Sequence, residues 1–256
     1  MPEVDRIVLS VAGFDPSGGA GIVRDAIVIE SAGLTSRCVP TRLTVQSEKR
    51  FLRIEWMSTR FLVESLSTLE HETIVAAKIG VVSSLEMLRT IVDLLRTRAH
   101  PIPIIWDPVL QSSTGFTFLP VLDREVLAML LEKIDLITPN VCEAKMLSGY
   151  SDPVQGALRL SRHCRVVLTG ALDSSKEMED LYFVGEQQLR TYPITEMLPD
   201  RHGTGCTFST SIATAVADGE SFEDAILMAQ ENVREYRRSR KLLSFGEREK
   251  WEGAHV

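Results

Sequence analysis

The stretch RIVLSVAGFDPSGGAGIVRDAIVIE, residues 6–30, decides the fold class. It begins with an apolar, β-branched run that predicts a buried strand, and it ends with Ile22, Ala26 and Ile29 at helical spacing. Glycines and a proline separate the two parts. The stretch therefore predicts a strand, a tight glycine-rich turn and a helix, which is the repeating unit of a parallel sheet.

The same alternation continues along the chain. Parallel strands need crossover connections, so we expect an α/β fold with a mostly parallel central sheet and helices on both faces. Residues 181–194 instead predict a hairpin that turns near Gly185. The other apolar runs, each followed by glycine or proline and a segment that can form a helix, are residues 74–82, 103–110, 135–140 and 165–170.

The bulk properties exclude several classes of protein. No repeat or linker interrupts the 256 residues, so we expect one domain, residues 1–256, with a polar tail from about residue 243. No apolar stretch is long enough to span a bilayer or act as a signal peptide, which favours a cytoplasmic protein without a membrane partner. The net charge of −7 argues against nucleic-acid binding, and we expect the basic run at 234–241 to be a solvated helix end.

Candidate site residues follow the predicted strands, because open α/β sheets bind ligands beyond the carboxyl ends of their strands. One group of these residues is rich in glycine and another in polar side chains. They are Gly13, Gly80, Asp107, Asn140, Thr169, Gly170 and the run from Gly203 to Cys206.

The HGTGC loop, residues 202–206, precedes a helix marked by Phe208, Ile212 and Ala215. Two glycines at a helix start can expose several backbone N–H groups, with the helix dipole behind them, and so form an anion site. A tight turn closed by a small buried cysteine is the alternative. Helix geometry alone leaves both open.

Two common nucleotide signatures are absent. No Gly-Lys pair exists for a P-loop, and the SGGAG segment at residues 17–21 lacks the spacing of a dinucleotide-binding turn. Any phosphate chemistry in this chain must therefore use another device.

Five motifs in order resemble the hydroxymethylpyrimidine and hydroxymethylpyrimidine-phosphate kinases of thiamine biosynthesis, in the ribokinase-like superfamily. The resemblance implies a three-layer ribokinase-like fold, a small-molecule substrate, ATP and Mg²⁺ as cofactors, and a homodimer. The motifs are AGFDPSGGAGIVRD from Ala12, KIGV from Lys78, DPVLQSSTG from Asp107, TPNVCEA from Thr138 and HGTGCTFS from His202.

The resemblance gives the HGTGC loop the central catalytic role. Cys206 would be the general base that takes the proton from the substrate hydroxymethyl group, and a helix N-terminus is expected to lower the pKa of its thiol. Gly203, Thr204 and Gly205 would form the anion hole with their backbone amides.

The resemblance also assigns the metal and nucleotide residues. Asn140 and Glu143 would help to hold Mg²⁺ and ATP, although the same spacing is that of an ordinary helix capping box. Asp107 would assist the metal or only shape a turn. Thr169 and Gly170 would contact ATP.

Four further residues would form the substrate side. Gln46 would contact the pyrimidine ring, or be an ordinary strand-end glutamine. Asp25 would face the pocket, or only complement the dipole of the first helix. Gly13 and Gly80 would let the backbone approach the ligand, or only allow tight turns.

The chain departs from the family pattern at several positions. Ser113 and Thr169 stand where many members have lysine, and Phe14 stands where a small serine is usual. The leading hypothesis is an ATP-dependent kinase that phosphorylates the hydroxymethyl group of 4-amino-5-hydroxymethyl-2-methylpyrimidine and also the monophosphate of this compound. A pyridoxal kinase of the same fold, and a ligand-binding homologue with little catalysis, are the alternatives.

Overall fold

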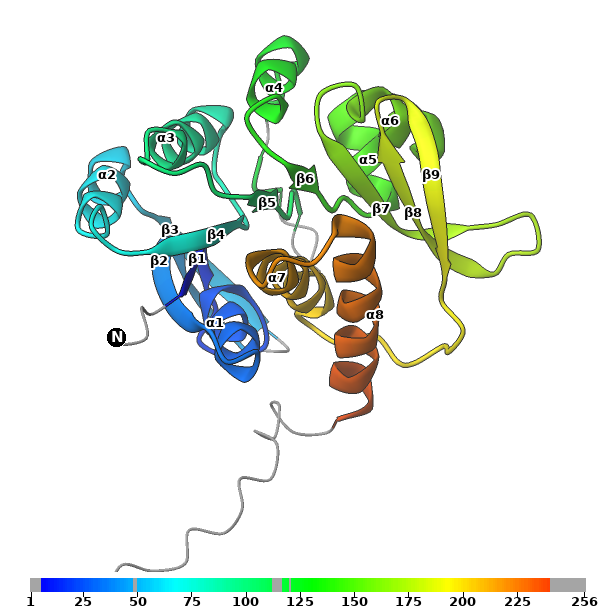
Figure 1. Ribbon diagram of the computed structural model, residues 1–256, viewed down its shortest axis with the longest axis horizontal. Coiled ribbons are helices and arrows are strands. Elements are labelled where there is room, and N and C mark those ends of the chain that lie inside the picture. The colour runs from blue at the N-terminus through cyan, green and yellow to red at the C-terminus, as the bar shows by residue number, and fades with distance from the viewer. Residues whose placement is uncertain (1–5, 48–49, 112–116, 120, 240–256) are drawn as a thin grey trace, which may run out of the picture.

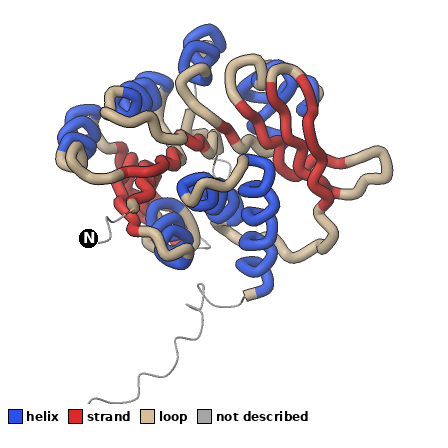
Figure 2. The backbone as a smooth tube through the Cα atoms, viewed as in Figure 1, coloured by secondary structure: helices blue, strands red, loops and turns tan. Residues whose placement is uncertain are grey.

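The computed structural model describes residues 6–47, 50–111, 117–119 and 121–239. Figures 1 and 2 show a central sheet with helices on both sides. The strands within these residues are β1 (Ile7–Phe14), β2 (Thr35–Ser47), β3 (Arg50–Trp56), β4 (Ile74–Ile79), β5 (Ile104–Trp106), β6 (Leu136–Ile137), β7 (Arg165–Leu172), β8 (Met178–Val184) and β9 (Gln187–Pro193). The helices are α1 (Gly21–Ser31), α2 (Thr59–Ser67), α3 (Leu85–Arg96), α4 (Arg124–Leu131), α5 (Val141–Ser148), α6 (Pro153–Leu160), α7 (Thr204–Ala217) and α8 (Phe222–Arg238).

The strands form one sheet with the order β3-β2-β1-β4-β5-β6-β7-β8-β9. The pairings from β2 through β7 are parallel, and antiparallel strands extend the sheet at both ends. This arrangement confirms the mostly parallel sheet predicted from the alternation. The predicted hairpin is also confirmed, because β8 and β9 turn at Gly185 and Glu186, whose φ angles of 56° and 66° suit a tight hairpin.

The sequence analysis did not predict β2 and β3. Pro40, Arg37 and Arg42 interrupt the apolar pattern of β2, and β3 carries Arg53 and Glu55 at the edge of the sheet. Charged side chains are common on edge strands because they discourage further pairing. These segments therefore lack the continuous apolar run by which the central strands were predicted, because they lie at or next to the exposed edge of the sheet.

The central strands are buried on both faces, which makes two separate apolar cores. Side chains alternate between them: Ile104 joins the core under α2 to α6, and Ile105 joins the core under α1, α7 and α8. The two helix layers lie on opposite sides of the sheet (Figure 1). The three-layer α/β architecture is thus the one the sequence predicted.

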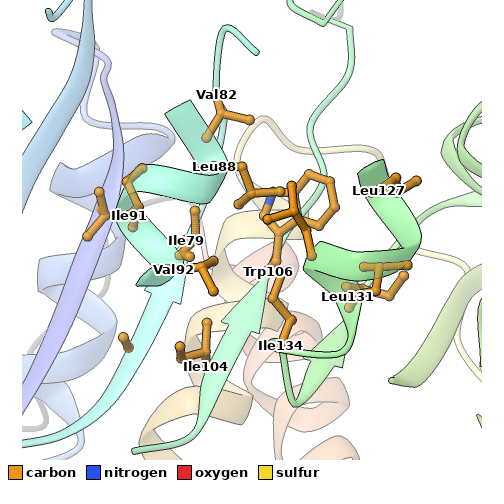
Figure 3. Close-up of a cluster of buried hydrophobic side chains, with 14 of the residues drawn as sticks. Ile79, Val82, Leu88, Ile91, Val92, Ile104, Trp106, Leu127, Leu131 and Ile134 are labelled. Atoms are coloured by element: carbon orange, nitrogen blue, oxygen red, sulfur yellow. The ribbon is translucent and has the colours of Figure 1, made fainter. Parts of the chain in front are cut away.

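The larger core surrounds Trp106 of β5. Leu88 and Ile91 of α3, and Leu127 and Leu131 of α4, lie around it (Figure 3). All of these side chains are at most 2% exposed, and burying each large apolar side chain contributes roughly 1.5–3 kcal/mol. This core fixes the end of β5, from which Asp107 follows. Within the described ranges, no helix has the length and apolarity to cross a membrane.

Candidate active site

A pocket of about 880 Å³ lies beyond the carboxyl ends of β1, β4, β5 and β7. Its position agrees with the expectation for an open parallel sheet. Most of the predicted site residues line it, from segments far apart in the sequence. These lining residues are Gly13, Gly80, Asp107, Asn140, Glu143, Thr169, Gly170, Gly203, Thr204, Gly205 and Cys206.

One predicted residue, Asp25, does not line the pocket, and two others cannot be placed from the described part of the chain. Asp25 is buried beneath the pocket. Gln46 pairs with Phe51 between β2 and β3, but its side chain falls outside the described part of the structure. Ser113 also lies outside the described residues.

Two helices that begin at the pocket lack side-chain caps. α1 and α7 start after Ala20 and Gly203, and neither residue caps the helix with a side-chain hydrogen bond. In contrast, α2, α3, α4, α5, α6 and α8 each start after a Ser, Asp or Asn that caps the first turn. Uncapped N–H groups and the positive end of the helix dipole favour an anion. The first turn of α7 also has no acidic residue to occupy that role.

Gly203 makes the HGTGC loop possible. Its φ of 87° lies in the left-handed region, and a Cβ atom at this position would stand 1.8 Å from the carbonyl oxygen of Gly19. Only glycine permits this approach between the two glycine-rich segments. The loop is also held from both sides, since His202 Nε2 lies 2.8 Å from Asp15 Oδ2 and the Tyr236 hydroxyl donates to the His202 carbonyl oxygen at 2.6 Å.

The Cys206 thiol lies at the end of this loop, in the first turn of α7, and lines the pocket. Burial raises the pKa of the thiol to about 12, Asp25 and Asp107 act in the same direction, and the Lys78 ammonium and the Gly21 backbone N–H oppose them. This direction corrects the expectation that the helix N-terminus would lower the pKa of Cys206. Loss of hydration is the largest of these influences and outweighs the two that favour the thiolate.

Asp25 was expected to face the pocket, and the structure corrects this position. Its carboxylate is fully buried, where it accepts hydrogen bonds from the Ser10 hydroxyl at 2.6 Å, Lys78 Nζ at 2.9 Å and the Thr210 hydroxyl at 2.8 Å. Lys78 lines the pocket in its place. Sequence reasoning gave Lys78 no role, although a lysine inside the apolar run 74–82 was a signal of a buried ion pair.

Asp107 and Glu143 form the acidic part of the pocket. Burial raises the pKa of Asp107, with Lys78 opposing, and the Ser209 hydroxyl donates to Asp107 Oδ2 at 3.2 Å. Burial and then the charge of Asp107 raise the pKa of Glu143 to about 8. Two buried carboxylates that repel each other fit a divalent cation, which would favour the charged form of both.

Asn140 and Glu143 also form the capping box that was the alternative reading. The Asn140 side chain accepts from the Glu143 N–H at 3.0 Å, and Glu143 Oε2 accepts from the Asn140 N–H at 2.9 Å. No group of three His, Cys, Asp or Glu side chains in the described ranges could hold a metal alone. Mg²⁺ commonly takes one or two carboxylates and completes its shell with water and substrate phosphates, so these residues fit that mode.

Thr169 and Gly170 lie at the other end of the pocket, beyond β7. The Gly170 N–H donates to Asp180 Oδ1 at 2.9 Å, and Gln230 of α8 donates to Asp180 Oδ2 at 2.8 Å. Asp180 and Gln230 both line the pocket but were not predicted. Their partners are distant in the sequence, so no local pattern could have identified them.

The basic run at 234–241 was expected to be a solvated helix end, and the structure corrects this for part of the run. Arg234 and Arg237 of α8 line the pocket, and the Arg237 side chain is only 18% exposed. Arg237 Nε lies 3.5 Å from the Thr204 hydroxyl, beside the uncapped start of α7. Arg237 Nη2 already pairs with Oδ1 of the exposed Asp200 at 3.0 Å, and a phosphate at the positive end of α7 would add a second anion beside this guanidinium. The arrangement can therefore bind phosphate.

The chain resembles known proteins over most of its length. A family model described as phosphomethylpyrimidine kinase matches residues 15–249. The thiamine biosynthesis multifunctional protein ThiED of Corynebacterium glutamicum is 32% identical over 240 residues, which are 88% of this chain and 30% of that protein. The hydroxymethylpyrimidine/phosphomethylpyrimidine kinase of Rhizobium meliloti is 29% identical over 88% of this chain and 87% of that protein. The chain thus spans less than a third of the multifunctional relative and most of the smaller one.

Solved structures show the same architecture. The crystal structure of phosphomethylpyrimidine kinase from Clostridium difficile 630 is 25% identical and has a TM-score of 0.75, over 90% of this chain and 99% of that one. The pyridoxal kinase from Staphylococcus aureus in complex with pyridoxal is 22% identical and has a TM-score of 0.78, over 92% and 89% of the two chains. At that identity the second likeness shows the fold alone.

Proposed function

The chain belongs to the phosphomethylpyrimidine kinase family, and from this premise we propose that it is an ATP-dependent kinase of thiamine biosynthesis. Its acceptors are 4-amino-5-hydroxymethyl-2-methylpyrimidine, called hydroxymethylpyrimidine below, and the monophosphate of this compound. The observation that carries the proposal is the uncapped start of α7, where Gly203 to Gly205 and Cys206 meet in one pocket.

The HGTGC loop serves transfer of the γ-phosphoryl group. The backbone N–H groups of Gly203 and Gly205 serve the phosphate oxygens, where charge is spread in the transition state. The Thr204 N–H donates to the Arg201 carbonyl oxygen at 3.2 Å and joins the anion hole only if it exchanges this partner for the phosphate. Cys206 accepts the proton of the hydroxymethyl group, whose oxygen bonds to the γ-phosphorus while the bond to ADP breaks. Because the pKa of the Cys206 thiol is raised, only a small fraction of the thiol is ionised. The thiolate that does form is a strong base and takes the proton readily. Lys78 below it supports the negative form.

Asp107, Glu143 and Asn140 hold Mg²⁺ with the phosphates of ATP. The ion supplies charge neutralisation at the phosphate oxygens. Thr169 and Gly170 contact the nucleotide at the β7 end of the pocket. Arg234 and Arg237 also line the pocket and supply positive charge there, each while paired with a carboxylate, Arg234 with Glu231 and Arg237 with Asp200.

The substrate side of the pocket is assigned to Gly13, Gly80 and Gln46. Gly80 lies close to the Lys78 ammonium: a Cβ atom added to Gly80 would stand 3.3 Å from Lys78 Nζ. We also propose that the chain forms a single domain and acts in the cytoplasm as a homodimer. Size-exclusion chromatography with light scattering tests the dimer, and a monomer at micromolar concentration would contradict it.

ADP release with each of three acceptors tests the function. Hydroxymethylpyrimidine, its monophosphate and pyridoxal are compared at equal concentrations with ATP and Mg²⁺. We expect turnover with the first two compounds to exceed that with pyridoxal by at least about tenfold, the net scale of one hydrogen bond. A preference for pyridoxal would make the chain a pyridoxal kinase. Calorimetric binding of the pyrimidine without any binding of ATP would make it a ligand-binding homologue.

A further inference from the structure

Arg42 of β2 lies at the end of the pocket opposite the proposed nucleotide residues. The sheet order places β2 and β7 on opposite sides of β1, β4, β5 and β6, and Arg42 and Gly170 both line the pocket. The Arg42 guanidinium lies 3.9 Å from the centre of the Phe118 ring and 5.7 Å from that of Trp56. Both distances are within the range of a cation–π contact, so the two rings hold the guanidinium in place.

Within the described residues, no carboxylate forms an ion pair with the Arg42 guanidinium. Its Nε and Nη1 atoms are buried and have no hydrogen-bond partner in the described part of the chain. Burial lowers the pKa of Arg42 to about 10, and the charges of Cys206 and Asp15 act in the opposite direction without offsetting it. A buried unpaired charge is costly, so a pocket-lining one indicates that an anion completes the site.

Gly13 makes room for this arginine. A Cβ atom on Gly13 would stand 2.6 Å from Arg42 Nε. The absence of a side chain at Gly13 of β1 therefore allows the Arg42 guanidinium to pack against this strand, where both residues line the pocket. Arg24 also has unpartnered buried nitrogens, but it is stacked against Tyr236 and does not line the pocket.

We propose that Arg42 binds the phosphate of a phosphorylated acceptor, and so makes the monophosphate of hydroxymethylpyrimidine the preferred substrate of this chain. The proposal rests on the proposed kinase function. A guanidinium can hold two oxygens of a phosphate at once, which orients the third towards the phosphoryl donor. It also reduces the repulsion between the acceptor phosphate and ATP.

The two acceptors then need different residues. A phosphate ester has a second pKa near 6, so at pH 7.5 its attacking oxygen carries no proton for Cys206 to remove. That oxygen forms the bond to the γ-phosphorus with its own electron pair, and the bond between the γ-phosphorus and ADP breaks with its pair leaving on ADP. Phosphorylation of the alcohol depends on Cys206, and phosphorylation of the phosphate depends on Arg42.

A comparison of two variants on two acceptors tests this division. Arg42→Gln is expected to lower kcat/KM for the monophosphate about 10- to 100-fold, the scale of a charge-assisted hydrogen bond, and to change that for hydroxymethylpyrimidine less than about threefold. Arg42→Lys keeps the charge and should recover part of the loss. Cys206→Ala should show the reverse preference. Arg60→Gln, at an arginine 86% exposed on α2, is the matched control and should change neither value.

The ratio between the two acceptors is measured on one preparation, so a partly unfolded variant does not change it. Calorimetry of the monophosphate without ATP adds a binding measurement, in which Arg42→Gln should weaken the Kd by a similar factor. Equal losses on both acceptors, or unchanged values with the monophosphate, would overturn the role of Arg42. A wild-type protein that phosphorylates neither pyrimidine would instead overturn the proposed function.

Discussion

Lys78 Nζ lies 2.9 Å from Asp25 Oδ2, and both side chains are completely buried. The pair joins β4 to α1, and Thr210 of α7 donates to the same carboxylate. Lys78 Nζ also lies 3.8 Å from Asp107 Oδ2. The buried Lys78–Asp25 ion pair therefore links strand β4 of the sheet to α1 and α7, the two helices that start at the pocket.

Removal of one member of this pair should destabilise the protein strongly. Asp25→Asn leaves the Lys78 charge buried with only Asp107 nearby, and an uncompensated buried charge costs about 3–5 kcal/mol. Urea denaturation measures the free energy of unfolding. Adding Lys78→Met removes the stranded charge, so the double variant should regain most of the stability while its turnover stays low. A double variant no more stable than Asp25→Asn would show that the pair is not the cause.

Cys206→Ala should lower turnover with hydroxymethylpyrimidine by roughly 100-fold or more, the usual contribution of a general base. Binding of ATP should be retained in calorimetry, because the backbone N–H groups remain. Since the pKa of Cys206 is about 12, the ionised fraction and the wild-type turnover should rise with pH between about 7 and 9. The variant should lose this slope.

Cys38→Ala is the matched control for the thiol. Cys38 is exposed and does not line the pocket, so its replacement should leave both the turnover and the pH slope unchanged. Unchanged turnover in Cys206→Ala with hydroxymethylpyrimidine would exclude Cys206 as the base.

The sequence predicted the sheet because its central strands are buried on both faces and so consist of continuous apolar residues, as in β4. It also predicted where the site lies, since residues after parallel strands share one edge. It could not pair Lys78 with Asp25, or Asp15 with His202, because 53 and 187 residues separate the partners. Arg42 was missed for another reason. The observation that singles it out is that its buried Nε and Nη1 have no hydrogen-bond partner in the described part of the chain, and no sequence pattern shows this.

Glu143 should make the protein less stable as the pH rises. Its pKa is about 8 in the folded chain, against an ordinary value of 4.5, so the folded state keeps a proton that the unfolded state releases. The free energy of unfolding should fall between about pH 4.5 and 8, by on the order of 5 kcal/mol. Denaturation at several pH values measures this change.

Glu143→Gln should flatten this dependence, because glutamine stays neutral and can still complete a capping box. Glu125→Gln, at an exposed glutamate in the first turn of α4, is the control and should retain the wild-type dependence. An identical slope in wild type and Glu143→Gln would contradict the raised pKa.

Gly203 and Gly219 provide a test of the close approach at the HGTGC loop. Both have left-handed φ angles, 87° and 95°, so alanine at either position costs about 1–2 kcal/mol of backbone strain. Nothing lies within 4 Å of a Cβ on Gly219, whereas a Cβ on Gly203 would overlap the Gly19 carbonyl oxygen at 1.8 Å. Gly203→Ala must therefore separate the two glycine-rich segments that His202 and Asp15 hold together.

Gly219→Ala should lose only the strain energy and keep full turnover per folded molecule. Gly203→Ala should lose more stability and, because the N–H groups of the anion hole move, about 100-fold in turnover, the effect of a misplacement near 1 Å. Urea denaturation and ADP release measure the two quantities on the same preparations. Equal behaviour of the two variants would mean that the contact with Gly19 does not hold the loop in place, and the anion hole would then have to form only when the phosphate binds.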